Sequence, residues 1–239
     1  PAKAAGVERI VLATPAKNGI VAPLTLVAAK ECGVSEVYKM GGAQAIAALA
    51  YGTQSVKKVD VIAGPGNIYV TLAKKEVYGE VGIDMLAGPS EILIIADESA
   101  NARYVAADVL SQAEHDVLAR AILVTPSRAL AEAVAKEVEL QLARLPRKEV
   151  VRKSIDTSGG IVVVDSLKEA CALANTVAPE HLEICTEHPE ALLPSITHAG
   201  AVFLGHYTPE PVGDYFAGPD HILPTSGSAK FFQVLNEDT

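Results

Sequence analysis

An adjacent carboxylate and imidazole, Glu180 and His181, stand immediately before a short apolar stretch that is predicted to be a strand. Both groups accept protons near neutral pH, so the pair would supply two general bases. On an extended backbone their side chains would point to opposite sides and act on different protons. A surface turn that begins at Pro179 explains the same residues without any chemistry, so both interpretations stay open.

A second candidate is a polar stripe on the helix predicted over residues 101–115. Asp108, Gln112 and His115 are spaced i, i+4 and i+7, which puts them on one face of a helix. Exposure to solvent explains such a stripe more simply than chemistry does. A glutamine amide is also neutral and a weak ligand for zinc, so its chemistry alone does not favour a metal site.

A segment rich in proline and glycine, residues 205–227, is predicted to be a long loop without secondary structure. Such loops inside compact domains are functional more often than not. Asp214, Asp220 and His221 lie in this segment and are candidate metal or substrate ligands. The other three histidines fit no pattern and are interpreted as structural: His188, His198 and His206.

Two glycine-containing turns follow predicted strands early in the chain, Gly41-Gly42-Ala43-Gln44 and Gly64-Pro65-Gly66-Asn67. Glycines at a strand-to-helix turn let a phosphate approach the backbone amides at a helix N-terminus. Neither turn is the G-x-G-x-x-G fingerprint, and a tight turn that needs glycine explains each one alone. Two such turns at the same edge of a sheet favour a nucleotide crevice.

The elements that must position these residues are short apolar strands alternating with alanine-rich helices. This alternation predicts an α/β fold of two Rossmann-like domains with mostly parallel sheets flanked by helices. A Gly-Pro interruption at residues 83–90 is expected to join the domains, which we assign to residues 1–86 and 87–227, with a further C-terminal segment beginning at residues 228–239. Strands are predicted at residues 9–14, 36–40, 59–63, 91–96, 121–124, 161–164, 182–185 and 201–204. Helices are predicted at residues 23–31, 41–51, 101–115, 127–145 and 166–175, with another running from the Asn67 turn to near Gly79.

Composition narrows the class of protein. The 239 residues are 49% hydrophobic, with no tryptophan and 5% aromatic residues, so the core must consist of small aliphatic side chains. A formal charge of −9 argues against nucleic acid as a partner. Cys32, Cys171 and Cys185 form no C-x-x-C pair, which is typical of a reducing compartment. No apolar run is long enough to span a bilayer. We therefore expect a cytoplasmic protein without a membrane partner.

Taken together, the motifs resemble those of the histidinol dehydrogenase family, and the resemblance extends over essentially the whole chain. Five motifs occur in the family's order, at residues 64–67, 84–91, 111–115, 178–183 and 213–225. The resemblance implies a zinc- and NAD-dependent, four-electron oxidation of L-histidinol through L-histidinal to L-histidine in histidine biosynthesis. It also implies a homodimer, an NAD-binding first domain, and a second domain that holds zinc and substrate.

The resemblance also assigns roles to individual residues. It implies Glu180 and His181 as the catalytic pair, His181 taking protons as hydride leaves the substrate and Glu180 activating water for the aldehyde step. The implied zinc ligands are Gln112, His115 and Asp214. The implied substrate contacts are Ser90, Gln112, His115, His181, Asp214 and His221. The implied NAD contacts are Gln44 and Asn67. Zinc would position the substrate rather than activate water.

The chain departs from the family pattern at three places. Asp220 replaces the more usual asparagine before His221. A fourth zinc ligand and a substrate-binding glutamate of the family would lie beyond Thr239, and a tyrosine that contacts NAD would lie before Pro1. We therefore expect a fragment that folds but binds zinc weakly and turns over slowly. The competing interpretations are a nucleotide-binding α/β module without catalysis and, less favoured, a zinc hydrolase.

Overall fold

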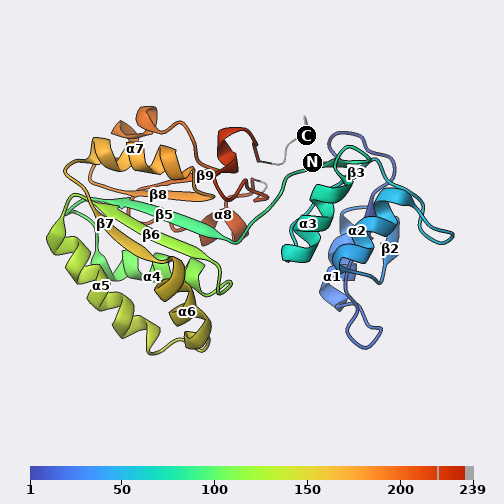
Figure 1. Cartoon of the computed structure of the whole chain (residues 1–239), viewed down its shortest axis with the longest axis horizontal. Coiled ribbons are helices and arrows are strands. Elements are labelled where there is room, and N and C mark those ends of the chain that lie inside the picture. The colour runs from blue at the N-terminus through green and yellow to red at the C-terminus, as the bar shows by residue number, and fades with distance from the viewer. Residues whose placement is uncertain (220, 235–239) are drawn as a thin grey trace. The chain divides into compact units, whose positions relative to one another are not determined.

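The computed structural model describes residues 1–219 and 221–234, and the chain divides into two compact units at the peptide between Ala87 and Gly88 (Figure 1). Residues 228–234 belong to the second unit. Asp220 and the end of the predicted C-terminal segment lie outside the described residues. Among the described residues, every pairing between named strands is parallel, which confirms the predicted α/β class with parallel sheets flanked by helices.

The first unit is built from short strands alternating with helices. Strand β1 (Val11–Ala13) pairs with β2 (Glu36–Tyr38), and β3 (Val61–Ile62) pairs with β4 (Gly82–Ile83), which gives two small sheets. The helices of this unit are α1 (Pro23–Glu31), α2 (Gly42–Tyr51) and α3 (Ile68–Val77). Strand β4 was not predicted, because two residues within the Gly-Pro interruption carry no readable alternation.

The apolar core of the first unit lies between helices α2 and α3 and the strands. It consists of buried aliphatic residues, namely Ile46, Leu49, Ala50, Val56, Ile62, Val77 and Val81. Helix α3 begins where the side chain of Asn67 accepts hydrogen bonds from the amides of Tyr69 and Val70. The cap sets the point at which the chain leaves the glycine-containing turn and becomes helical.

The second unit is a five-stranded sheet in the order β7-β6-β5-β8-β9. Its strands are β5 (Glu91–Ala96), β6 (Arg120–Thr125), β7 (Gly160–Val163), β8 (His181–Cys185) and β9 (Ala201–Leu204). Its α-helices are α4 (Ala102–Ala113), α5 (Arg128–Leu142), α6 (Lys148–Ser158), α7 (Leu167–Val177) and α8 (Pro211–Tyr215). Short 3-10 turns cover Pro189–Ala191, Leu193–Ser195 and Ser228–Lys230.

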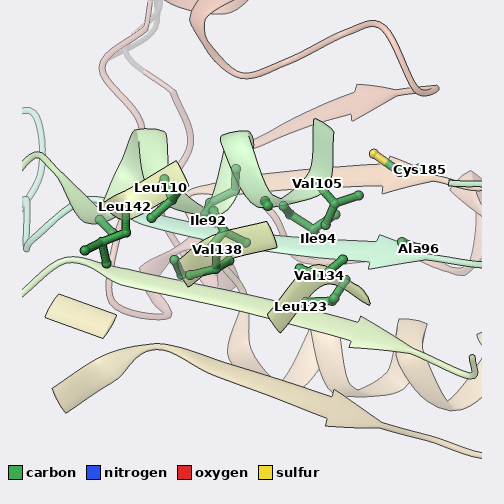
Figure 2. Packing of buried hydrophobic residues seen from close by; sticks show 14 of the residues in the cluster. Ile92, Ile94, Ala96, Val105, Leu110, Leu123, Val134, Val138, Leu142 and Cys185 are labelled. Atoms are coloured by element: carbon green, nitrogen blue, oxygen red, sulfur yellow. The ribbon is translucent and has the colours of Figure 1, made fainter. Parts of the chain in front are cut away.

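Strand β5 is the centre of this unit and is buried along its whole length. Ile92 and Ile94 face helices α4 and α5 in one apolar cluster, which Figure 2 shows from close by. Leu93 and Ile95 face helix α7 in a second cluster. Because side chains alternate along a strand, helices on both faces require the uninterrupted apolar run that the sequence has here.

Two predictions of secondary structure were wrong. The helix predicted over residues 127–145 ends at Leu142, and an additional helix, α6, follows it. The predicted loop at residues 205–227 contains the short helix α8, because Pro211 is favoured in a first helical turn and begins a segment that continues to Tyr215.

All three cysteines are free, Cys32 exposed and Cys171 and Cys185 buried. Within the described part of the chain, none of the helices has the length and apolar character needed to cross a membrane.

Candidate active site

Glu180 and His181 stand at the amino end of β8, beside the central strand β5. Helix α7 ends at Val177, the next residue, Ala178, adopts a left-handed conformation (φ 51°, ψ 63°), and Pro179 then leads the chain into the strand. His181 is the first residue of β8 and pairs in register with Ile92. Because the strands are parallel, the amino ends of β5, β8 and β9 meet at this edge.

Both side chains are anchored on the backbone of Glu91. The Glu91 amide donates a 2.9 Å hydrogen bond to Oε2 of Glu180, and Nδ1 of His181 lies 2.9 Å from the Glu91 carbonyl oxygen. Oε2 of Glu180 and Nδ1 of His181 are 3.7 Å apart. The expectation that the two side chains point to opposite sides is therefore wrong, because Glu180 precedes the strand and is not subject to its alternation.

A surface turn at this position is also excluded, since His181 is only 3% exposed. Gly200, just before β9, packs directly on the backbone of the pair. Its amide donates a hydrogen bond to the Pro179 carbonyl oxygen at 2.9 Å. A Cβ atom at position 200 would lie 2.6 Å from the carbonyl oxygen of Glu180, so only glycine permits this approach.

The hydrogen bonds of His181 define its tautomer. A carbonyl oxygen can only accept, so the Nδ1 that faces Glu91 carries the hydrogen. In the neutral ring Nε2 is then unprotonated, and it lies 2.9 Å from Nε2 of His221, which must be the donor. In this contact Nε2 of His181 is therefore the acceptor and Nε2 of His221 the donor.

Two carboxylates surround His221. Its Nε2 lies 3.4 Å from Oε1 of Glu210 and 3.6 Å from Oδ1 of Asp214. The hydrogen bond to Glu210 is the main cause that raises the pKa of His221. Burial acts to raise the pKa of Glu210, but the hydrogen bond from His221 and the positive potential of the nearby histidines outweigh it, and the pKa is lowered. The contact therefore favours a cationic His221 beside an ionised Glu210.

Burial shifts the pKa values of the central pair in opposite senses. It lowers the pKa of His181 to about 4 and raises the pKa of Glu180 to about 8. A histidine with a low pKa is neutral at pH 7 and ready to accept a proton. A carboxyl group with a pKa near 8 is mostly protonated at pH 7, and its ionised form is a stronger base than an ordinary carboxylate. Perturbed bases of this kind are typical of catalytic sites.

A second pair of carboxyl groups, Asp108 and Glu183, supports the start of helix α8. Oε1 of Glu183 accepts a 2.8 Å hydrogen bond from the amide of Glu210, the residue that precedes the helix. Burial and the proximity of Asp108 raise the pKa of Glu183 well above its ordinary value. Burial likewise raises the pKa of Asp108 to about 6. Two carboxyl groups in contact cannot both ionise easily, so one proton is retained between them.

The sequence alone favoured a solvent-exposed polar stripe on α4, but Gln112 in that stripe is buried. The side chain is 1% exposed, and neither polar atom of its amide has a hydrogen-bond partner among the described residues. His115 lies beyond the end of the helix at Ala113 and not on it. Its Nδ1 is 2.9 Å from the Ser111 carbonyl oxygen, which leaves the Nε2 lone pair for a ligand.

His115 and Asp214 both neighbour the central histidines. The charge of His115 acts on the pKa values of His181 and Glu210, and Asp214 contacts His221. Among the histidine, cysteine, aspartate and glutamate side chains of the described residues, a trio has its ligand atoms within 4.8 Å of one another: His181, Glu210 and His221. Ser90, which precedes β5, is half-buried at the same sheet edge and accepts a hydrogen bond from the Arg120 amide.

The donor set nevertheless fits a metal ion. A buried amide without a partner is costly, and an external ligand would remove that cost for Gln112. His115 presents an imidazole lone pair and Asp214 a carboxylate, both ordinary zinc ligands. The trio of His181, Glu210 and His221 is already linked by one hydrogen bond and one ion pair, so the unpartnered amide is the stronger sign of a missing ligand.

The first unit contains a cavity of about 330 Å³ that both glycine-containing turns line. Gly41, Gly42 and residues 64–67 contribute backbone to its wall, and β1 and β3 contribute apolar side chains. Asn67 lines the cavity while its side-chain oxygen caps α3. Gln44 is exposed, and its side chain folds toward Gly42. Exposed backbone at a helix N-terminus beside an apolar wall fits a dinucleotide.

Three residues of the site were missed in the sequence: Glu91, Glu183 and Glu210. Glu91 acts through its backbone, and Glu183 occupies an apolar strand where a carboxylate has no partner in sequence. The sequence held one signal for such a residue: Glu183 lies inside an apolar strand, and a charged residue in a fully buried strand requires a polar partner.

These features define a parallel α/β protein with a glycine-lined cavity in one unit and an imidazole–carboxylate centre in the other. The comparison with known families is specific. The family model described as histidinol dehydrogenase matches residues 1–239, so the chain belongs to the histidinol dehydrogenase family.

Individual relatives agree with this assignment. The chain is 61% identical over 240 residues to a histidinol dehydrogenase of Heliobacterium mobile and 61% identical over 237 residues to that of Bacillus subtilis. The crystal structure of histidinol dehydrogenase from Elizabethkingia anophelis superposes with a TM-score of 0.96 at 44% identity and covers 100% of this chain. The chain spans 56% of each of the two relatives and 55% of the crystallised protein.

Proposed function

We propose that the chain is the NAD- and zinc-binding part of an L-histidinol dehydrogenase, which oxidises L-histidinol through L-histidinal to L-histidine in histidine biosynthesis. The observation that carries this proposal is the neutral His181, whose Nε2 lone pair faces the site beside a second base, Glu180. Family membership supports the identity of the substrate.

Specific residues would hold zinc and NAD. Gln112, His115 and Asp214 would hold zinc, and Gln44 and Asn67 would contact NAD beside the glycine-containing turns. NAD would accept hydride in each oxidation, and zinc would hold the imidazole and amino nitrogens of the substrate. Ser90 and His221 would contact the substrate as well.

His181 is suited to the proton transfers of both oxidations. An alcohol, or the hydrate of an aldehyde, that loses hydride from carbon must also lose the hydroxyl proton. The unprotonated Nε2 of His181 can accept it when the substrate hydroxyl replaces His221 as the donor to this atom, since Nδ1 is already committed to the Glu91 carbonyl oxygen. Once protonated, the ring is stabilised by Glu210, whose Oε1 lies 3.7 Å from Nε2.

Glu180 is suited to the step between the two oxidations. Water adds to the aldehyde carbon and must give up a proton, which the Glu180 carboxylate can take. The Glu91 amide, and not the imidazole of His181, donates the hydrogen bond to Oε2 of Glu180. The two bases can therefore take protons independently of each other. Keeping the reactive aldehyde in one pocket for both oxidations avoids its release.

The test is NADH formation from L-histidinol and separately from L-histidinal, in the presence of zinc. The proposal expects two NADH for each histidinol and one for each histidinal. His181→Asn should slow both reactions, whereas Glu180→Gln should slow mainly the reaction of the aldehyde. Equal losses in both reactions after Glu180→Gln would contradict this division. NAD binding without any turnover would instead favour a non-catalytic nucleotide-binding module. Light scattering would test the homodimer that the family resemblance implies.

A further inference from the structure

A buried ion pair lies in the first unit, and neither of its residues has been given a role above. Lys74 on helix α3 and Asp84 just after β4 are each 2% exposed, and their side chains form a salt bridge. Removing two charges from water is unfavourable, and neutral side chains of similar size often stabilise a fold as well or better. Such a pair therefore needs an explanation other than stability.

The pair is fastened to one residue, Gly64, at the start of the second glycine-containing turn. The Gly64 amide donates a 2.7 Å hydrogen bond to Oδ2 of Asp84, and Nζ of Lys74 donates a 3.0 Å hydrogen bond to the Gly64 carbonyl oxygen. Oδ1 of Asp84 also accepts from the Met85 amide at 2.7 Å. Both backbone groups of Gly64 are thus held by charged side chains, whose hydrogen bonds are stronger than those between neutral groups.

The residues that follow Gly64 form part of the wall of the 330 Å³ cavity. Gly64 itself has a positive φ of 119°, and Gly66 is packed so closely that a Cβ atom there would lie 2.6 Å from Cβ of Val70. Pro65 fixes one backbone angle of this turn, but Gly64 and Gly66 on either side of it have little rigidity of their own. At Gly64 the conformation is held by Lys74 and Asp84.

We propose that the Lys74–Asp84 ion pair positions the Gly64 turn for dinucleotide binding. The proposal rests on the proposed NAD-dependent function and adds two positioning residues to it. The pair holds the peptide groups on either side of Gly64, so that residues 65–67 keep the shape that an anionic cofactor would meet at the start of α3. Neither side chain touches the cofactor in this role, because both are buried.

The experiment compares NAD binding by this chain and its variants with isothermal titration calorimetry. Lys74→Met alone would leave the charge of Asp84 buried and unpaired, which is strongly destabilising. The informative variant is therefore Lys74→Met/Asp84→Asn, which removes both charges together. The amide oxygen introduced at position 84 can still accept from Gly64, but the Met85 amide then loses its acceptor and the carbonyl oxygen of Gly64 loses its donor. Lys75→Met, on the exposed face of the same helix, is the matched control.

We expect the double variant to unfold within a few degrees of the unsubstituted chain but to bind NAD about tenfold or more weakly, since small misplacements of a binding loop are costly. Hydrogen exchange at residues 64–67 should accelerate, while zinc binding, which depends on the second unit, should not change. The Lys75→Met control should match the unsubstituted chain in every measurement.

Unchanged NAD affinity in a folded double variant would overturn the positioning role and leave the proposed function intact. A double variant that fails to fold would assign the pair to stability, which also overturns the role. No NAD binding by the unsubstituted chain would refute the proposed function, and the role of the pair with it.

Discussion

The raised pKa of Glu180 predicts how the free energy of unfolding depends on pH, which can be tested without measuring catalytic activity. The side chain is 13% exposed, and burial is the main cause that raises its pKa from 4.5 to about 8. The folded state therefore holds the proton more tightly than the unfolded state does. The resulting stability is complete below about pH 4.5 and is lost as the pH rises through about 8, and in full it amounts to roughly 5 kcal/mol.

Glu180→Gln should remove this dependence. Glutamine has nearly the same size, never ionises, and can still accept the hydrogen bond from the Glu91 amide through its oxygen. The pKa values of Asp108 and Glu183 are raised in the same direction, but both groups titrate in both proteins, so their effects largely cancel in the comparison. The difference between the two proteins therefore reports mainly the ionisation of Glu180, with smaller contributions from Glu91 and His221, whose charges interact with it.

The assay is urea unfolding of the metal-free chain and of Glu180→Gln at pH 5 and pH 8.5. Between these two values, the unsubstituted chain should lose about 3 to 4 kcal/mol more of its free energy of unfolding than the variant does. Equal losses in the two proteins would refute the reasoning, because they would mean that the folded state places no penalty on the Glu180 carboxylate. A variant more sensitive to pH than the parent would reverse the sign and refute it as well.

Three further predictions concern the metal, the core and the cofactor turn. Gln112→Leu should lower the zinc content, measured by plasma mass spectrometry, below that of the unsubstituted chain. Thermal stability should stay equal or rise, because a buried unpaired amide is removed. A zinc content equal to that of the unsubstituted chain would contradict the ligand assignment. Leu93→Ala, at a site with no exposure in the central strand, should lower the free energy of unfolding by about 3 kcal/mol; a loss below about 1 kcal/mol would show that the core collapses around the cavity. Gly66→Ala should force the Gly64 turn away from Val70 and weaken NAD binding in calorimetry, and unchanged affinity would mean that the turn does not approach the cofactor.

The central elements of the fold were predictable from local patterns. Strand β5 was predicted with its observed bounds, because a short, almost entirely apolar run rich in isoleucine is typical of a buried strand. Helix α1 was also predicted with its observed bounds, since Pro23 marks its start. The two-residue strand β4 and the short helix α8 were missed, because their pairing and packing partners are distant in sequence.

The site was predictable in its residue types and not in its geometry. Glu180 and His181 drew attention as adjacent bases, but nothing near them in sequence indicated that Glu91 would hold both through its backbone. Glu210 lies thirty residues from Glu180 and comes to the site only because α8 begins there. Long-range pairing of this kind is a property of the sheet order, which local periodicity does not encode.

Gly200 has a consequence for how variation at this site would be observed in a genetic screen. The residue has no side chain and donates nothing to the chemistry, yet any larger residue would press on the carbonyl oxygen of Glu180. A genetic screen for loss of activity would therefore recover substitutions at position 200 as well as substitutions of Glu180 and His181. A ranking of positions by the chemistry of their side chains would overlook Gly200. At position 200, tolerance to mutation is limited by the space around the Glu180 peptide group. The reactivity of Glu180 and His181 therefore depends on a residue that has no reactive group itself.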